Sequence, residues 1–421
     1  MKPELIPITE RHTSTVMQSA KQTHKQWSPW AMAFAILLGV AALPPSAQGQ
    51  TFTVLYAFQG GTDGQGPNGG VVRDNAGNLY GTTSKGGAFS NGTVFKLDTT
   101  GQETVLYTFT GGVDGAIPLA GLIRDAAGNL YGTTEAGGDL TCNSGVGCGT
   151  VFKLDTTGKE TVLHSFTDKD GTSPIAGVIR EAAGNFYGTT PQGGPFSSGT
   201  VFKLDKTGKE TVLYTFTGGM GGKDGSYPDG ALIRDAAGNL YGTTQLGGNY
   251  SFGTVFKVDS TGKETVLYRF YGGSNGLNPV GGLIMDKAGD LYGATEGGGL
   301  FFDGTVFKLS PVSSKPVLHS FAGAADGSLP VAGVIADTAG NLYGTTQYGG
   351  TSNLGTVFKL DRAGNETVLH SFTGGADGAS PVAGLVRDAA GNLYGTAYFG
   401  GDSSSRCSGV GGCGVVFKIA P

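Results

Sequence analysis

A segment of the type Leu-Tyr-Gly-Thr-Thr recurs seven times along the chain, and this repetition is the feature that most constrains the fold. Successive tyrosines of the segment are 51, 56, 54, 51, 51 and 51 residues apart, and a second segment, Gly-Thr-Val-Phe-Lys-Leu-Asp, recurs in step with it. A fixed period of this length indicates one supersecondary unit that stacks repeatedly. The seven repeats are centred on Tyr80, Tyr131, Tyr187, Tyr241, Tyr292, Tyr343 and Tyr394.

Each repeat holds four short runs of β-forming residues, which we name A to D, separated by glycine-rich or polar turns. In the second repeat the four runs are residues 120–125, 129–134, 149–155 and 160–166. We expect no helices after residue 50, because no run shows helical spacing between caps. Four antiparallel strands at a period near fifty residues are typical of a propeller blade. We therefore predict an all-β, seven-bladed β-propeller over residues 51–421, with strand A, which carries the small residues, innermost.

The two ends of the repeat region predict how the ring closes. The seventh repeat supplies strands A to C over residues 383–388, 392–397 and 414–420, and the chain then ends without a strand D. Residues 51–58 match the strand D pattern and precede any strand A. The N-terminal strand should therefore complete the last blade, which leaves the ring without a free sheet edge.

The first 49 residues differ in kind from the repeats. Lys21 and Lys25 precede the apolar run 31–43, and small residues follow it. This order is typical of a secretory signal with a long basic region, cleaved between about Ala47 and Gln50. The apolar run is shorter than the roughly 20 residues of a membrane span. We predict a signal peptide over residues 1–49 and export to the periplasm, cell surface or medium; the alternative is an uncleaved signal anchor.

The four cysteines form two pairs of matched spacing, each with five residues between its members. In an exported chain an even count at matched spacing indicates disulfides, whereas a zinc site needs closer cysteines and usually histidines. Local pairing is favoured among the three possible connectivities. The predicted disulfides are Cys142–Cys148 and Cys407–Cys413.

Strand order divides the connections between two faces. The tight A–B and C–D turns share one face, here called the turn face, and the B–C and D–A loops share the other, the loop face. The B–C loops vary most between repeats, so we expect ligand contacts there. They either tuck their aromatic side chains under neighbouring glycines or present them as a platform for a sugar or peptide. These predicted contact residues are Phe89, Phe196, Tyr250, Phe252, Phe301, Phe302, Tyr348, Tyr398 and Phe399.

The D–A loops repeat an aspartate before glycine, which a local turn explains. The alternative is a ring of carboxylates at the mouth of the axis that binds a cation such as Ca²⁺, the one cofactor that the sequence suggests. The fifth repeat has Asn275 at this position. The predicted metal ligands are Asp63, Asp114, Asp170, Asp224, Asp326 and Asp377.

Residues that recur in most copies are explained by the fold rather than by catalysis. His164, His319 and His370 stand on strand D where other copies have tyrosine, so we assign them structural roles and name no catalytic residue. Five arginines end strand A beside an acidic residue of the same blade, and we expect ring-like salt bridges there. The arginines are Arg73, Arg124, Arg180, Arg234 and Arg387.

The unit A-G-L-I-R-D-A-A-G-N-L-Y-G-T-T, followed by G-T-V-F-K-L-D and E-T-V-L-Y, resembles the bacterial tandem repeat called GloVer. All seven copies match, over residues 51–421. The resemblance implies an exported, repeat-rich protein and no particular activity. More distantly, the G-N-L-Y segment is similar to NHL-type propellers and to the streptogramin lyase and lactonase propellers, an analogy of fold.

These features together favour a non-catalytic, exported binding propeller with a carbohydrate or protein ligand on the loop face. The alternative is a propeller lyase or hydrolase acting on a carbohydrate or lactone, assisted by a metal at the D–A aspartates. A net charge of −5 and a charged fraction of 14% argue against nucleic acid or an anionic membrane as partner. We expect a monomer that does not contact the membrane once the signal is cleaved.

Overall fold

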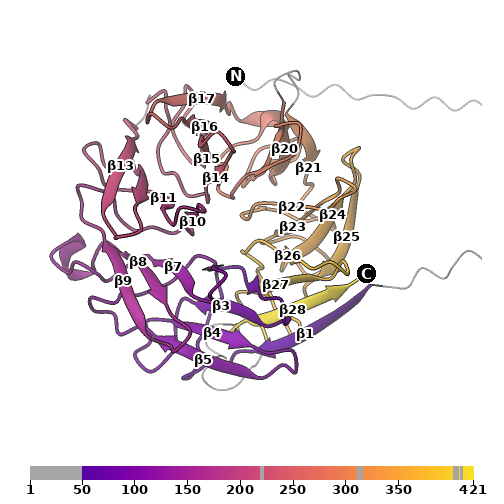
Figure 1. The fold of residues 1–421 in the computed structure, drawn as a ribbon. Coiled ribbons are helices and arrows are strands. Elements are labelled where there is room, and N and C mark those ends of the chain that lie inside the picture. The colour runs from indigo at the N-terminus through magenta and orange to yellow at the C-terminus, as the bar shows by residue number, and fades with distance from the viewer. Residues whose placement is uncertain (1–49, 219–221, 311–315, 402–406, 408–410) are drawn as a thin grey trace, which may run out of the picture. The chain divides into compact units, whose positions relative to one another are not determined.

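The computed structural model describes residues 50–218, 222–310, 316–401, 407 and 411–421. Within them, 28 strands form seven four-stranded antiparallel sheets that surround a common axis (Figure 1). The predicted seven-bladed β-propeller is therefore confirmed. Blade 1 comprises β2 to β5, blades 2 to 6 follow in steps of four strands, and blade 7 combines β26, β27, β28 and β1. The predicted signal peptide, residues 1–49, lies outside the described residues.

The strands of position A are innermost, and each is only two residues long. The sequence predicted six-residue strands here, such as 383–388, and this was wrong. The cause is the close approach of neighbouring blades at the axis: a Cβ on Gly121 would lie 3.0 Å from the Gly70 carbonyl oxygen of blade 1. The A strands are β2 (Val72–Arg73), β6 (Ile123–Arg124), β10 (Ile179–Arg180), β14 (Ile233–Arg234), β18 (Ile284–Met285), β22 (Ile335–Ala336) and β26 (Val386–Arg387).

The strands of positions B and C form the middle of each blade and are almost fully buried. The B strands are β3 (Leu79–Thr83), β7 (Leu130–Thr134), β11 (Phe186–Thr190), β15 (Leu240–Thr244), β19 (Leu291–Thr295), β23 (Leu342–Thr346) and β27 (Leu393–Ala397). The C strands are β4 (Thr93–Leu97), β8 (Thr150–Leu154), β12 (Thr200–Leu204), β16 (Thr254–Val258), β20 (Thr305–Leu309), β24 (Thr356–Leu360) and β28 (Val415–Ala420).

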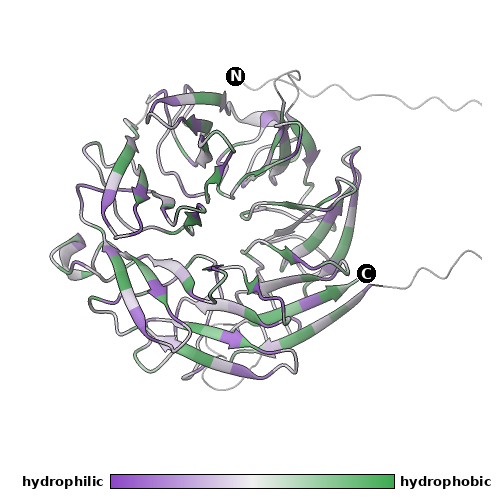
Figure 2. Cartoon of the chain, viewed as in Figure 1, coloured by the Kyte–Doolittle hydropathy of each residue, from purple (hydrophilic) through white to green (hydrophobic). Residues whose placement is uncertain are grey.

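The strands of position D are outermost, and hydrophobic and hydrophilic residues alternate along several of them (Figure 2). This alternation is expected where one side of a strand packs on the next blade and the other meets water. The D strands are β5 (Glu103–Thr108), β9 (Glu160–Ser165), β13 (Glu210–Thr215), β17 (Glu264–Arg269), β21 (Val317–Ser320), β25 (Glu366–Ser371) and β1 (Thr51–Ala57).

The ring closes through the two ends of the repeat region, as the sequence predicted. Strand β1 pairs antiparallel with β28, from Thr51 opposite Ala420 to Ala57 opposite Val415 (Figure 1). Seven repeats therefore make seven complete blades, with the outer strand of blade 7 supplied by the start of the repeat region.

The core lies between the blades rather than within them. At each junction a phenylalanine that follows strand D meets a phenylalanine of strand C in the next blade, and Phe109 and Phe152 have ring centroids 5.1 Å apart. Both are fully buried. A threonine of strand B also crosses the junction: the Thr133 hydroxyl donates to the Ala176 carbonyl oxygen of the next blade over 3.0 Å. Large apolar contacts and a buried hydrogen bond thus join neighbouring blades.

Two three-residue 3₁₀ turns are the helical elements of the described residues, η1 (Asn143–Gly145) in blade 2 and η2 (Gly273–Asn275) after blade 4. No helix in the described part of the chain has the length and apolar character needed to cross a membrane.

Candidate functional site

The predicted contact residues of the loop face fall into an exposed and a sheltered group. Phe89, Phe196, Tyr250 and Phe301 stand at the same position of four B–C loops, and each is between 56% and 60% exposed. Phe302 and Tyr348 are exposed as well. Phe252, Tyr398 and Phe399 are half-buried. Phe252 lies against Gly272 and Tyr398 against Gly66. The sheltered side chains therefore pack against glycines, whereas the exposed ones form an open aromatic surface.

Phe302 has a backbone conformation that phenylalanine rarely adopts. Its φ is 69°, in the left-handed region. Ser90, Ser197, Ser251 and Asn353 occupy the equivalent loop position with φ between 52° and 63°. Serine and especially asparagine tolerate this region better than a bulky side chain does. Blade 5 thus presents an exposed phenylalanine at a strained position of its loop.

The D–A aspartates do not meet around the axis. Each accepts hydrogen bonds from its own D–A segment, and all but Asp326 also bond a tyrosine or histidine of strand D in the same blade. Asp114, for example, accepts from the Tyr107 hydroxyl (2.9 Å) and the Thr110 amide (2.7 Å). Among the described residues, no three of these aspartates come within metal-ligand reach of one another. The six are Asp63, Asp114, Asp170, Asp224, Asp326 and Asp377.

The cysteines pair as the sequence predicted, Cys142 with Cys148 and Cys407 with Cys413. Both disulfides are local bridges within B–C loops of the loop face. They close the two longest of these loops, in blades 2 and 7.

The five arginines of strand A contact the preceding blade rather than forming the predicted ring of salt bridges. Each guanidinium carbon lies 5.6 to 5.8 Å from the ring centroid of a strand B tyrosine one blade back, as Arg234 lies over Tyr187. Arg234 also pairs with Glu181 of that blade at 3.0 Å, and among the described residues it is the one arginine of the five within salt-bridge distance of a carboxylate. These contacts are mainly cation–π in character.

A lysine of strand C in the same blade also lies over two of these tyrosine rings. Lys203 Nζ lies 5.8 Å from the Tyr187 ring centroid, on the ring that Arg234 also covers. Tyr187 and Tyr394 are thus each contacted by a lysine of the same blade and by an arginine of the next.

The junction between blades 5 and 6 lacks this arginine. Ala336 stands in its place, and no guanidinium of the described residues lies over the Tyr292 ring. Lys308 still covers Tyr292 from within blade 5, at 5.2 Å. At the junction before it, Met285 replaces the arginine and packs with Tyr241 in the core between blades 4 and 5.

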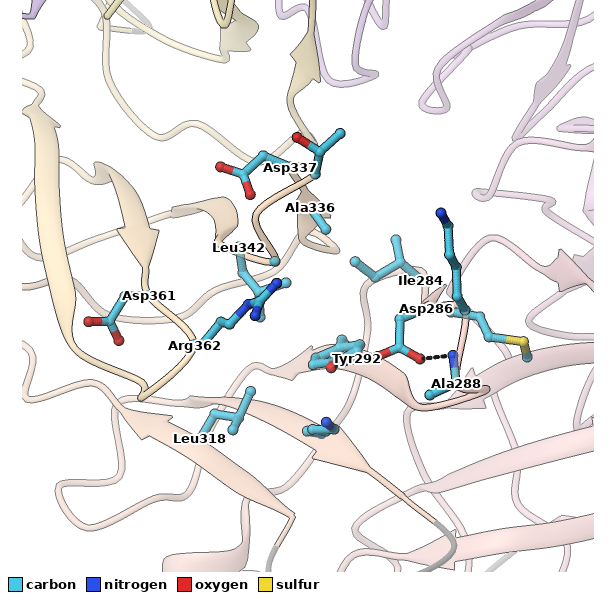
Figure 3. A pocket seen from close by; sticks show the side chains of 15 residues that line it. Ile284, Asp286, Ala288, Tyr292, Leu318, Ala336, Asp337, Leu342, Asp361 and Arg362 are labelled. Atoms are coloured by element: carbon cyan, nitrogen blue, oxygen red, sulfur yellow. Dashed lines mark hydrogen bonds between the residues drawn. The ribbon is translucent and has the colours of Figure 1, made fainter.

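A pocket of about 760 Å³ opens at the junction of blades 5 and 6, on the turn face (Figure 3). Figure 3 shows Tyr292 and Asp286 on the blade 5 side and Ala336, Asp337 and Arg362 on the blade 6 side. This volume is in the range of small-molecule sites. The apolar part of the wall consists of Ile284, Met285, Tyr292, Leu318, Ala336 and Leu342.

Oδ2 of Asp286 has one hydrogen-bond donor fewer than Oδ2 of its counterpart in blade 2. In blade 2 the equivalent Asp125 Oδ2 accepts from the Asn129 side chain and the Tyr131 hydroxyl, both at 2.9 Å. In blade 5 the asparagine is replaced by Asp290, and Asp286 Oδ2 accepts from the Tyr292 hydroxyl at 2.9 Å. Asp290 itself pairs with Lys308 at 2.7 Å, and this bond lowers the pKa of Asp290. Lys308 is thus engaged away from Asp286.

This pocket lies on the turn face, whereas the sequence placed the ligand contacts on the loop face. The sequence does show that Met285 and Ala336 replace the strand A arginine in repeats 5 and 6. The pocket could not be predicted from this replacement, because the sequence of one blade does not show that its arginine contacts the tyrosine of the preceding blade.

Comparison with known proteins supports the fold. No curated protein matches the chain in sequence. The extracellular domain of BT3049, assigned as a hybrid two component system of B. thetaiotaomicron, is 12% identical with a TM-score of 0.54, over 88% of this chain and 41% of that one. That of BT4673 from the same organism is 14% identical with a TM-score of 0.53, over 88% and 42%.

This chain thus spans less than half the length of these two proteins. The gluconolactonase XC5397 of Xanthomonas campestris is 13% identical with a TM-score of 0.43, over 88% of this chain and 89% of that one. The likeness to the two B. thetaiotaomicron domains, at 12% and 14% identity, shows the propeller fold alone. The family model of the Gloeobacter/Verrucomicrobia repeat matches residues 43–234 and 220–407, so the chain belongs to this repeat family, as its resemblance to GloVer predicted.

Proposed function

We propose that this chain is an exported, non-catalytic binding propeller whose pocket between blades 5 and 6 receives a guanidinium group, such as an arginine side chain of a peptide or protein. One observation carries the proposal. At five other junctions an arginine of the chain covers the strand B tyrosine, whereas Ala336 leaves the equivalent face of Tyr292 open to the pocket.

The chemistry of the vacated position favours a guanidinium over other groups. A guanidinium is planar, stacks on aromatic rings and donates in a fork to carboxylates. Tyr292 supplies the ring, and Asp286 Oδ2 supplies an acceptor at the place where Glu181 accepts from Arg234 at a regular junction. A ligand arginine would repeat the cation–π contact that the chain itself makes five times and the carboxylate contact that it makes once.

The lining of the pocket supports binding rather than catalysis. Among the described residues its lining contains no histidine, cysteine or serine, the side chains that most often act as base and nucleophile. Its charged side chains are three acids and three bases, namely Asp286, Asp337, Asp361, Lys287, Lys308 and Arg362. Such a mixed rim around an apolar wall suits a peptide that carries polar groups beside its arginine.

The test is saturation-transfer NMR with N-acetyl-arginine amide against N-acetyl-citrulline amide, which has the same shape without the charge. We expect a signal from the arginine compound and at least tenfold weaker binding of the citrulline compound. Ala336→Arg should fill the pocket from within and abolish binding. Ala127→Arg, on an exposed A–B turn of blade 2, is the matched control and should leave binding unchanged. Equal binding to wild type and Ala336→Arg would contradict the proposal.

The loop face is a second candidate binding surface, favoured by the shared exposure of Phe89, Phe196, Tyr250 and Phe301. Open aromatic rings at equal positions of several blades suit an extended carbohydrate or peptide that contacts one ring per blade. A glycan array with the wild type, Phe301→Ala and Phe302→Ala tests this surface. Hits that weaken in both variants would support it, and hits that both variants retain unchanged would place the ligand elsewhere.

The proposal of export is supported by the two disulfides, which form and persist in oxidising compartments. The two B. thetaiotaomicron proteins of similar fold are extracellular domains. Mass spectrometry of the protein from its native host should give a mature chain that begins near residue 50. A chain that retains residues 1–40 would contradict cleavage.

A further inference from the structure

A second feature of the junction between blades 5 and 6 lies on its outer side. His319 of β21, Asp326 of the D–A loop that follows and Glu366 of β25 in blade 6 each offer one ligand atom, and these atoms lie within 4.8 Å of one another. All three residues are partly buried. His319 Nε2 and Asp326 Oδ2 are 3.8 Å apart, which is too long for a hydrogen bond.

Two polar atoms of this cluster are shielded from water and have no hydrogen-bond partner, His319 Nε2 and Glu366 Oε1. The imidazole bonds the backbone of Gly364. That bond must use Nδ1, since Nε2 has no partner. The Nδ1 proton therefore goes to a backbone carbonyl, and Nε2 presents its lone pair to two carboxylates. A shielded acceptor that faces two others is costly, whereas histidines that bind metals are usually held in this way.

In blade 2 the equivalent histidine and aspartate are directly hydrogen-bonded. His164 Nε2 lies 2.9 Å from Asp170 Oδ2, and the Thr167 hydroxyl also donates to that aspartate. In blade 5 the threonine is replaced by Ala322, whose amide alone anchors Asp326, at 3.1 and 3.0 Å to its two carboxylate oxygens. The missing hydroxyl leaves Asp326 apart from the imidazole.

The remaining histidine junction lacks the second carboxylate. His370 Nε2 lies 3.1 Å from Asp377, and Phe52 stands where the other blades have the glutamate, stacked on His370 with centroids 3.7 Å apart. Apart from the disulfide-bonded cysteines with Asp168, the cluster of His319, Asp326 and Glu366 is the one group of three metal-ligating side chains in the described residues.

We propose that His319 Nε2, Asp326 and Glu366 bind a divalent cation of the Zn²⁺ type across the junction of blades 5 and 6. One imidazole and two carboxylates are ligands that zinc accepts, with water at the fourth position. Tetrahedral bonds of about 2.0 to 2.1 Å place ligand atoms roughly 3.4 Å apart. Because the ligand atoms lie within 4.8 Å of one another, closure by about 1.4 Å or less would suffice. The cation would supply the missing partner of both shielded atoms and link two blades.

Zinc titration by calorimetry on tag-free, EDTA-treated, oxidised full-length chain tests the site. We expect one zinc per chain and a rise in Tm with zinc. His319→Tyr restores the residue that Tyr107 and Tyr214 represent in other blades, so it should fold, and it should weaken zinc binding at least tenfold. His164→Tyr is the matched control and should bind zinc as the wild type does.

A second variant tests the geometry without removing a ligand. Ala322→Thr restores the hydroxyl that ties aspartate to histidine in blades 2 and 6, so zinc should bind about tenfold more weakly. Unchanged zinc affinity in His319→Tyr, or equal loss in His319→Tyr and His164→Tyr, would overturn the proposal. So would a Ca²⁺ affinity as high as that for zinc, which would mark a carboxylate site without the imidazole.

Discussion

The junction between blades 5 and 6 and the junction between blades 3 and 4 are built from the same repeat, yet they treat the same space differently. At the regular junction Arg234 covers Tyr187 and pairs with Glu181. At the irregular one Ala336 leaves Tyr292 and Asp286 facing a pocket of about 760 Å³. The difference teaches that a repeat fold can open a pocket by omitting one side chain from a contact that five other junctions complete.

The difference extends along the whole of blade 5. Ala294 replaces the threonine that donates across the junction in the other six blades. In the aligned repeats, Asn275 and Lys315 replace the aspartate and glutamate of other copies. Its B–C loop exposes Leu300, Phe301 and Phe302. Blade 5 therefore carries several departures from the repeat, and both proposed binding sites lie beside this blade.

The largest expected effect concerns the buried threonine. Thr133→Ala should lower the free energy of unfolding by about 1 to 3 kcal/mol, because it leaves the buried Ala176 carbonyl without this donor. The reverse change, Ala294→Thr, should stabilise by up to about 1 kcal/mol. Urea unfolding measures both, with the exposed Thr104→Ala as control. A destabilised Ala294→Thr would show that junction 5–6 is too different for the comparison to hold.

A second test converts a regular junction into an irregular one. Arg234→Ala should cost about 1 kcal/mol, since the cation–π contact and the ion pair with Glu181 are only partly buried. It should also open a hollow beside Tyr187 that binds N-acetyl-arginine amide. Lys209→Ala, an exposed lysine of blade 3, is the control for lost charge. If the variant loses stability but gains no binding, the missing arginine alone does not make the site.

The ring and its closure could be predicted from the sequence because both depend on the order of the runs along the chain. The disulfides followed from spacing in the same way. The pocket could not be predicted, since it depends on Ala336 of one blade and Tyr292 of another, and the repeat shows contacts within a blade only. The short A strands were missed for a related reason: seven chain segments crowd at the axis, where Gly121 meets Gly70, and this prevents longer pairing.

A smaller effect comes from a glutamate at the start of strand D that recurs in most blades and is absent from blade 5. Glu103, Glu160, Glu210 and Glu264 each have a pKa raised to about 7, first by burial and then by the aspartate of the preceding blade. A folded pKa above the unfolded value of about 4.3 means that the folded state holds more protons in this window. Stability should therefore fall as pH rises from about 4.5 to 7.

Thermal unfolding between pH 4.5 and pH 8 measures this slope. Glu160→Gln should reduce it and raise Tm at pH 8, because the amide carries no charge to bury beside Asp114. A slope that Glu160→Gln leaves unchanged would assign the pH dependence to other groups. Blade 5 makes the comparison sharper, since Lys315 and Asn275 replace this acidic pair and should contribute none of the slope.

The smallest expected effect concerns the loop of blade 5. Phe302→Asn should raise the free energy of unfolding by a few tenths to about 1 kcal/mol, because asparagine accepts a φ of 69° with less strain than phenylalanine. Asn353 already occupies the equivalent position in blade 6, and Ser251→Asn in blade 4 should change little. Urea unfolding of the two variants measures the difference. A gain in stability combined with loss of glycan binding would mean that blade 5 retains a strained, exposed ring for its contact with a ligand, whereas a gain without such a loss would reduce Phe302 to an irregularity of the repeat.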